Sequence, residues 1–277
     1  MAPSKKSKDR KRKAAARPLL LDFQIRRKLT AAEEFIQAEN LIAARQVLVE
    51  LRHGAPGHPA VLEHLAYVCF QLREWPAYVE IAERLRERAP DRSSLYLSLA
   101  DGYLRAGMPF RAVQALEDFC ARFPKDPQLA TARDDIARIQ RLCDDVLADL
   151  RARDGLALAR EAATRLLREH EWLQILIAAG RFDEALELGR RLEQEVPDWP
   201  SLCNNLGTLL GLLGENEESL SYAERILARH PGNAFALAER ARRLYLLGRS
   251  EDAQRALREA EERDRKSTRL NSSHANV

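Results

Sequence analysis

The chain has 277 residues, 45% of them apolar, which is enough to bury a sizeable core. Ala, Leu, Glu and Arg dominate and no run of β-branched residues occurs, so the composition argues against strands and predicts an all-α fold. No apolar run approaches the roughly 18 residues needed to cross a membrane. The four cysteines are scattered without disulfide or metal-ligand spacing, which favours buried thiols in a reducing, cytoplasmic compartment.

Residues 1–17 form a distinct basic segment, with eight Lys or Arg and one Asp, although the net charge of the whole chain is only +3. The segment lacks hydrophobic periodicity, so we predict a disordered tail, and Pro18 interrupts the apolar stretch that a secretory signal needs. Three interpretations remain open: a solubilising head, a contact with phosphates on nucleic acid or an anionic membrane, and a targeting signal. No aromatic residues lie among the charges, so base stacking is not indicated.

Residues 18–126 repeat with a period of 34 residues. Pro56, Pro90 and Pro124 are 34 residues apart, and Leu65-Ala66 recurs as Leu99-Ala100. We therefore predict three helix pairs in this part of the chain, at about 25–58, 59–92 and 93–126.

The second of these pairs departs from the pattern at two positions. Arg73 stands where the third pair has Gly107, and Tyr78 stands where the third pair has Ala112. Tyr78 is too large for a position that elsewhere holds a small residue, so the pattern does not settle how this pair packs.

Residues 127–165 interrupt the period, because the next proline in register after Pro124 is Pro197. We predict an irregular helix pair here, over 127–151 and 155–168, at a junction between two halves of three repeats each. The acid pairs Asp134-Asp135 and Asp144-Asp145 lie on the first of these helices. Neighbouring residues point about 100° apart on a helix and no histidine is near, so a solvated face is favoured over a metal site.

Residues 166–263 resume the period with pairs at about 166–199, 200–233 and 234–263. The segment from Pro200 to Pro231 has the clearest pattern, with leucines at steps of three and four before Gly214. Arg240 stands where the other pairs have leucine, which suits a terminal pair whose outer side meets water. Residues 264–277 have no helical pattern and look like the translation of a common sequencing-adapter oligonucleotide, so we interpret them as an artefact.

Counting Pro200 as position 1 of a 34-residue unit, small residues recur at positions 8, 20 and 27. This spacing resembles the tetratricopeptide repeat (TPR) family. The resemblance implies a right-handed superhelical solenoid of about seven helix pairs, with one irregular longer unit in the middle. It also implies a concave groove lined by positions 2, 5, 9, 12 and 13 of each first helix. The groove residues that we predict, including the neighbouring position-6 asparagine, are Glu63, Tyr67, Phe70, Gln71, Leu97, Asp101, Leu104, Arg105, Asn204, Asn205, Thr208, Phe235 and Arg242.

Two known groove devices of this family can be compared with the chain. The lysines and asparagine that hold a partner's C-terminal carboxylate are missing, because Leu29, Glu33 and His64 occupy those positions. Asn205 resembles one rung of the asparagine ladder with which other members hold peptide backbones. The resemblance therefore disfavours chaperone-tail binding and leaves backbone capture open.

No phosphate-binding glycine loop, zinc-helix histidine pair or nucleophile elbow occurs in the sequence, and His53, His58 and His64 do not share a helical face. We expect no catalysis, cofactor or metal. Our main hypothesis is a non-catalytic scaffold that binds a peptide or protein segment in the groove, with an unknown partner. The alternatives are the N-terminal recognition domain of a larger enzyme truncated at its C-terminus, and RNA binding through the basic tail.

Overall fold

The computed structural model describes Phe23 and residues 25–274. The predictions for the basic tail at residues 1–17 lie outside this part of the chain. All regular elements between residues 25 and 274 are helices, so the predicted all-α fold is confirmed. No helix in the described part is long and apolar enough to cross a membrane.

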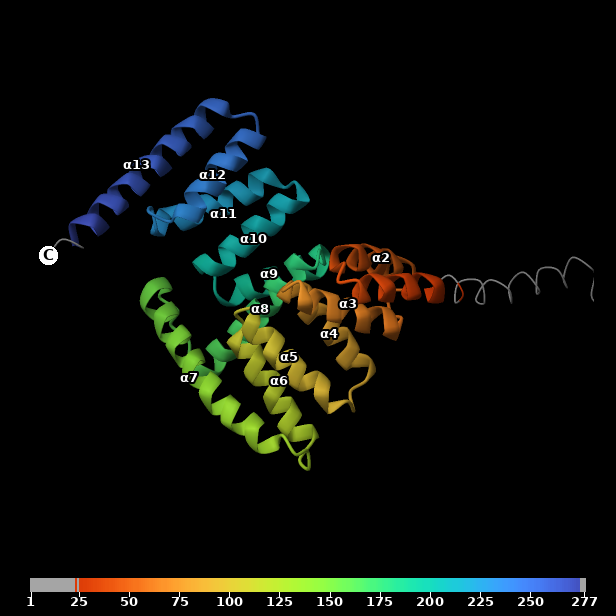
Figure 1. Ribbon diagram of the computed structural model, residues 1–277. Helices are drawn as coiled ribbons and strands as arrows, with labels where there is room; N and C mark the ends of the chain where they lie inside the picture. Colours follow the sequence, from red (N-terminus) through yellow and green to blue (C-terminus); the bar gives the residue numbers. More distant parts are fainter. Residues whose placement is uncertain (1–22, 24, 275–277) are drawn as a thin grey trace, which may run out of the picture. The chain divides into compact units, whose positions relative to one another are not determined.

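The chain divides into two compact units, Met1–Ile139 and Gln140–Val277, with the boundary inside one long helix. Within each unit, consecutive helices pack side by side (Figure 1). After a helix over residues 25–37, the elements are α2 (Leu41–Gly54), α3 (Pro59–Gln71), α4 (Trp75–Arg88), α5 (Ser93–Arg105), α6 (Pro109–Arg122), α7 (Leu129–Asp154), α8 (Arg160–Ala178), α9 (Phe182–Glu195), α10 (Pro200–Leu213), α11 (Asn216–Arg229), α12 (Ala234–Leu246) and α13 (Ser250–His274).

The ends of these helices follow local chemistry. Prolines occupy the first turn of α3, α4, α6 and α10, where a missing backbone N–H costs no hydrogen bond. The side chains of Asn40 and Asn233 cap α2 and α12 by accepting hydrogen bonds from the backbone N–H groups of Ala43 and Ala236. The pairs predicted at 25–58, 59–92, 93–126, 200–233 and 234–263 each correspond to two helices.

The turn inside each pair needs a left-handed backbone at position 15. Gly107, Gly180, Gly214 and Gly248 have φ between 71° and 87° there. In the first two pairs the same position is held by Glu39 and Arg73, each with φ 58°. The turn geometry is therefore kept where the glycine is not, at the energetic cost that a Cβ adds in this region.

This cost predicts opposite effects of two substitutions. Arg73→Gly should raise the free energy of unfolding by about 0.5–1 kcal/mol, because it relieves the left-handed strain. Gly107→Ala should lower it by about 1 kcal/mol, and no atom lies near the added Cβ, so backbone strain is the whole effect. Urea unfolding of both variants tests the pair, and a destabilised Arg73→Gly variant would contradict the assignment.

The structure explains how Tyr78 fits a position that is elsewhere small. A Cβ added to Gly102 would lie 2.5 Å from Tyr78 Cε1, so the missing side chain of α5 makes room for the ring of α4. The Tyr78 hydroxyl donates to the backbone oxygen of Ser98 at 3.2 Å. The large residue in one pair is thus matched by a glycine in the next.

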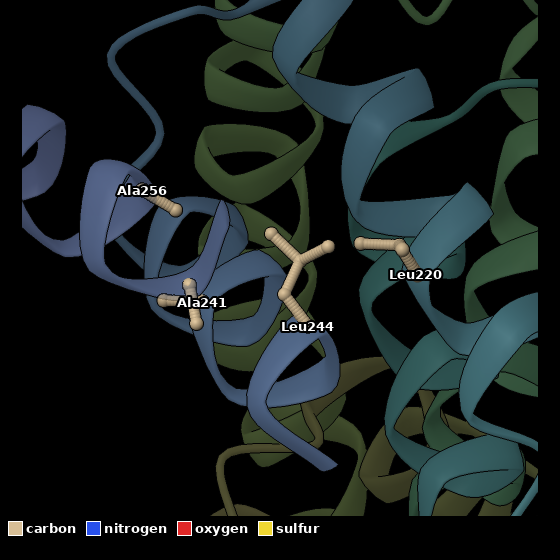
Figure 2. Packing of buried hydrophobic residues seen from close by; sticks show 5 residues of the cluster. Leu220, Ala241, Leu244 and Ala256 are labelled. Atoms are coloured by element: carbon tan, nitrogen blue, oxygen red, sulfur yellow. The ribbon is translucent and has the colours of Figure 1, made fainter. Parts of the chain in front are cut away.

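The last pair shows the packing that the repeat pattern predicts. Leu220 of α11 and Leu244 of α12 point toward one another, with Ala256 of α13 beside them (Figure 2). Ala241 and Ala253 complete the cluster, and all five residues are buried. Small residues at positions 8, 20 and 23 of this pair let α12 and α13 approach closely.

Two predicted features of the helices are wrong. Residues 127–165 do not form a pair: α7 is a single helix, residues 155–159 are non-helical, and α8 begins only at Arg160. The described residues therefore hold six pairs and one unpaired helix, and α8 includes most of the helix predicted over 155–168. The last helix also does not end near residue 263, because α13 continues to His274.

The reason for the different boundary lies in two contacts and one apolar stripe. Asp154 ends α7 with its carboxylate accepting from Trp199 Nε1 at 3.1 Å and from Ser201 Oγ at 3.2 Å, and Gly155 follows with φ 68°. From there to the next turn, buried residues continue without a break at steps of three and four from Ala163 to Leu176. One continuous buried stripe supports one helix, not two.

Candidate functional site

The first helices of the pairs carry nearly all of the predicted groove residues. In unit 1 (residues up to 139) these are the helix over 25–37, α3 and α5, and in unit 2 (residues from 140) they are α8, α10 and α12. On each such helix, positions 5, 9 and 13 form one row, because steps of four advance by little more than one turn. We call the row and its flanking residues the first-helix face of that unit.

In unit 1 the structure brings three predicted residues into one cluster. The Phe70 ring lies edge-on to Trp75 and Tyr78, with ring centroids 5.4 Å apart in both cases. The Arg105 guanidinium lies 5.5 Å from the Phe70 ring centroid and 5.2 Å from that of Trp75. Arg105 Nε also donates to Asp101 Oδ2 at 2.7 Å. The cation is therefore held by two aromatic faces and one carboxylate.

The other predicted residues of unit 1 lie around this cluster. Tyr67 is 49% exposed and Gln71 is exposed, whereas Leu97 and Leu104 are half-buried. Glu63 forms an ion pair of 2.6 Å with Arg92, and both side chains are about half exposed. Paired surface charges of this kind contribute little to stability but fix the charge pattern of the face.

In unit 2 the predicted residues Asn204, Thr208 and Phe235 line one small pocket with Glu239. Its volume is about 10 Å³, room for about one water molecule. Asn204 Oδ1 is buried in the described structure and has no hydrogen-bond partner there. Arg242 is exposed at the surface, with its guanidinium 3.6 Å from the Glu239 carboxylate.

Asn205 is already engaged within the protein. Its Nδ2 lies 2.9 Å from His170 Nε2, and the His170 ring packs on Trp199 with centroids 4.5 Å apart. Burial lowers the pKa of His170 to about 4, against a backbone hydrogen bond with Ser201 that raises it. The amide thus holds a buried neutral imidazole, a role that the sequence did not indicate.

This burial predicts how stability depends on pH. An unfolded chain binds a proton at His170 near pH 6.5, whereas the folded chain does not until about pH 4. The free energy of unfolding should therefore fall as pH is lowered from 6.5 to 4, by up to about 1.4 kcal/mol per pH unit. Urea unfolding at several pH values measures this slope. His170→Phe keeps an aromatic ring on Trp199 and should have a smaller slope; equal slopes in both proteins would refute the assignment.

Some exposed residues of the faces were not among those predicted. Leu212, Tyr245 and Leu246 are large apolar residues that are exposed at positions 12 and 13 of α10 and α12. The same position rule that selected Phe70 and Arg105 could have selected them. Trp75 could not have been found this way, because it lies on a second helix and reaches the cluster only through packing.

The described residues offer little for metal or redox chemistry. No group of three or more His, Cys, Asp or Glu among them could hold a metal ion. Asp135 and Asp144, from the two acid pairs, form ion pairs with Arg138 at 2.9 Å and Arg160 at 2.6 Å. Cys69 and Cys203 are buried, as predicted, and burial raises the pKa of Cys69 to about 12 and of Cys203 to about 11, so both thiols stay protonated.

Residues 95–126 match the model of the tetratricopeptide repeat family. The chain contains a tetratricopeptide repeat. The matched segment corresponds to the predicted third pair, and it covers α5 and α6. Together with the helix pairs described above, this confirms the family that the sequence pattern indicated. A comparison with curated proteins finds no match.

Solved TPR structures resemble the chain at low sequence identity. The crystal structure of MamA protein has a TM-score of 0.39 and 11% identity, and the match covers 76% of this chain and 94% of that one. YrrB, described as a TPR protein with an unusual peptide-binding site, has a TM-score of 0.38 and 13% identity, with 83% and 97% covered. The TPR2AB domain of yeast Sti1, in a complex with pHSP90, has a TM-score of 0.36 and 11% identity, with 92% and 96% covered. Because these TM-scores are below 0.5, we base the family assignment on the matched repeat and the helix pairs.

Proposed function

We propose that this TPR protein is a non-catalytic scaffold that binds peptide or protein segments on the first-helix faces of its two units. The observation that carries the proposal is where the large apolar side chains are exposed. Ten such residues are exposed in the described part of the chain, and six of them lie on the first helices α3, α10 and α12: Tyr67, Leu212, Leu213, Phe235, Tyr245 and Leu246. Apolar groups that gather on one kind of surface favour contact with another chain.

The chemistry of the faces supports the same proposal. Aromatic and arginine side chains are the residue types that contribute most to protein–protein binding. In unit 1 they occur together, since Arg105 is held over Phe70 and Trp75 and still exposes part of its guanidinium. YrrB and the Sti1 domain are described as binding a peptide or pHSP90, and we extend to this chain only the use of a TPR surface for such a segment.

The proposal can be tested by selecting short random peptides, displayed on phage, on the full chain. Selected peptides should bind the chain in fluorescence polarisation, and either Tyr67→Ala or Phe235→Ala should weaken each of them about tenfold or more, as expected for a central contact residue. Ile42→Ala is the matched control, because Ile42 is equally apolar and exposed but lies on the second helix α2. If no peptide is enriched, or if Ile42→Ala weakens binding as much, the proposal fails.

A further inference from the structure

The two first-helix faces differ in charge. At positions 5, 9 and 13, unit 1 has the charged residues Glu33, Glu63, Asp101 and Arg105. The same positions of α8, α10 and α12 have Arg242 alone. Helix α10 has no charged residue in its entire length from Pro200 to Leu213. The difference is a property of the units and not of the repeat pattern, which is the same in both.

The uncharged face of unit 2 is continuous over two helices. Asn204, Thr208 and Leu212 follow one another at steps of four on α10, and Phe235, Arg242 and Leu246 form the corresponding row on α12, with Tyr245 beside it. The two helices are in contact. We call these seven residues the α10–α12 face. Four of them (Leu212, Phe235, Tyr245 and Leu246) are apolar side chains exposed by 48% to 69%.

A hydrogen-bond acceptor lies at the inner edge of this face. Asn204 Oδ1 has no partner in the described structure, and it borders the pocket lined by Thr208 and Phe235. An unsatisfied buried acceptor costs free energy, and a donor that reaches it recovers that cost. The pocket volume of about 10 Å³ is too small for a partner side chain but admits a single N–H group.

From these observations we infer that the α10–α12 face binds an uncharged, apolar peptide segment, one of whose backbone N–H groups donates to Asn204 Oδ1. This inference rests on the function proposed above and specifies its partner. An apolar segment gains by covering Leu212, Phe235, Tyr245 and Leu246. A charged segment would lose hydration against a surface whose exposed charge in the described structure is Arg242, and Glu239 already lies beside that cation.

The inference is tested by peptide selection on two forms of the full chain. Short random peptides on phage are selected on the unmodified chain and then on L212D/L246D, which places two charges on the face. Peptides that bind only the unmodified chain should have apolar residues at every position where an alanine scan abolishes binding. If those positions instead hold Lys, Arg, Asp or Glu, the inference is overturned.

Two further outcomes separate this inference from the proposed function. If all selected peptides bind L212D/L246D normally and lose binding in Tyr67→Ala, the scaffold function stands and the assignment to the α10–α12 face falls. If no peptide is enriched on either form, both fall. Circular dichroism of each variant verifies that its helices are intact.

The role of Asn204 has its own measurement. Asn204→Leu removes the acceptor at similar size and should weaken a selected peptide about tenfold. Methylation of one backbone nitrogen of the peptide should weaken binding to the same extent, and the two changes together should cost no more than either alone. The methylated peptides test the contact even if Asn204→Leu misfolds. Unchanged affinity throughout the methylation series would overturn the hydrogen bond to Asn204.

Discussion

Leu206→Ala should lower the free energy of unfolding by about 2–5 kcal/mol, since it removes buried methyl groups and leaves a cavity. Leu206 is 0% exposed on α10. A Cβ added to Gly189 of α9 would lie 2.5 Å from Leu206 Cδ2, so the leucine fills the space between two pairs. Its loss therefore weakens the contact between pairs as well as the packing within one. Urea unfolding followed by circular dichroism measures the change.

The control for this prediction is on the same helix. Leu212 is 56% exposed, so Leu212→Ala should change the free energy of unfolding by no more than about 0.5 kcal/mol. The two leucines have the same chemistry and helix propensity and differ in burial. Similar destabilisation by both substitutions would show that position in the repeat does not determine burial as described here.

The Tyr78–Gly102 contact should give the second large effect. Gly102→Ala places a Cβ against a buried aromatic ring and should cost about 1–3 kcal/mol as overpacking. Tyr78→Ala should cost about 3–5 kcal/mol, because it empties the space that the ring fills. The double variant should be more stable than the sum of the two effects predicts, since the added methyl group then enters the cavity. Denaturant unfolding of the four proteins completes the cycle.

Gly54→Ala separates the contact from the general effect of replacing a helical glycine. No atom lies within 4 Å of a Cβ at Gly54, which ends α2. This substitution should be neutral or stabilise by up to about 1 kcal/mol through helix propensity. If Gly102→Ala behaves like Gly54→Ala, or if the cycle shows no coupling, then the glycine does not accommodate the tyrosine.

The candidate faces could be predicted in part. A period of 34 residues tells which residues of a first helix point away from the core, so Tyr67, Thr208 and Phe235 could be chosen without coordinates. The period does not tell what a side chain meets. Asn205 is one residue away from the row and contacts His170 of the preceding pair, 35 residues earlier. Arg105 meets Trp75, which belongs to the second helix of another pair.

The sequence by itself determined the helix pairs and their turns, because these depend on interactions within a few residues. Apolar residues at steps of three and four specify a buried stripe, and proline and glycine specify where it begins and ends. This is why five predicted pairs agree with the helices observed.

Tertiary structure decided everything that needs two elements to meet. The start of α8 at Arg160 depends on the continuation of its buried stripe, and the end of α7 at Asp154 depends on a contact with Trp199. Tyr78 fits because of Gly102, on another helix. Close packing makes each side chain depend on its neighbours in space, and a periodic pattern contains the facing side of a helix but not the identity of the residue that it faces.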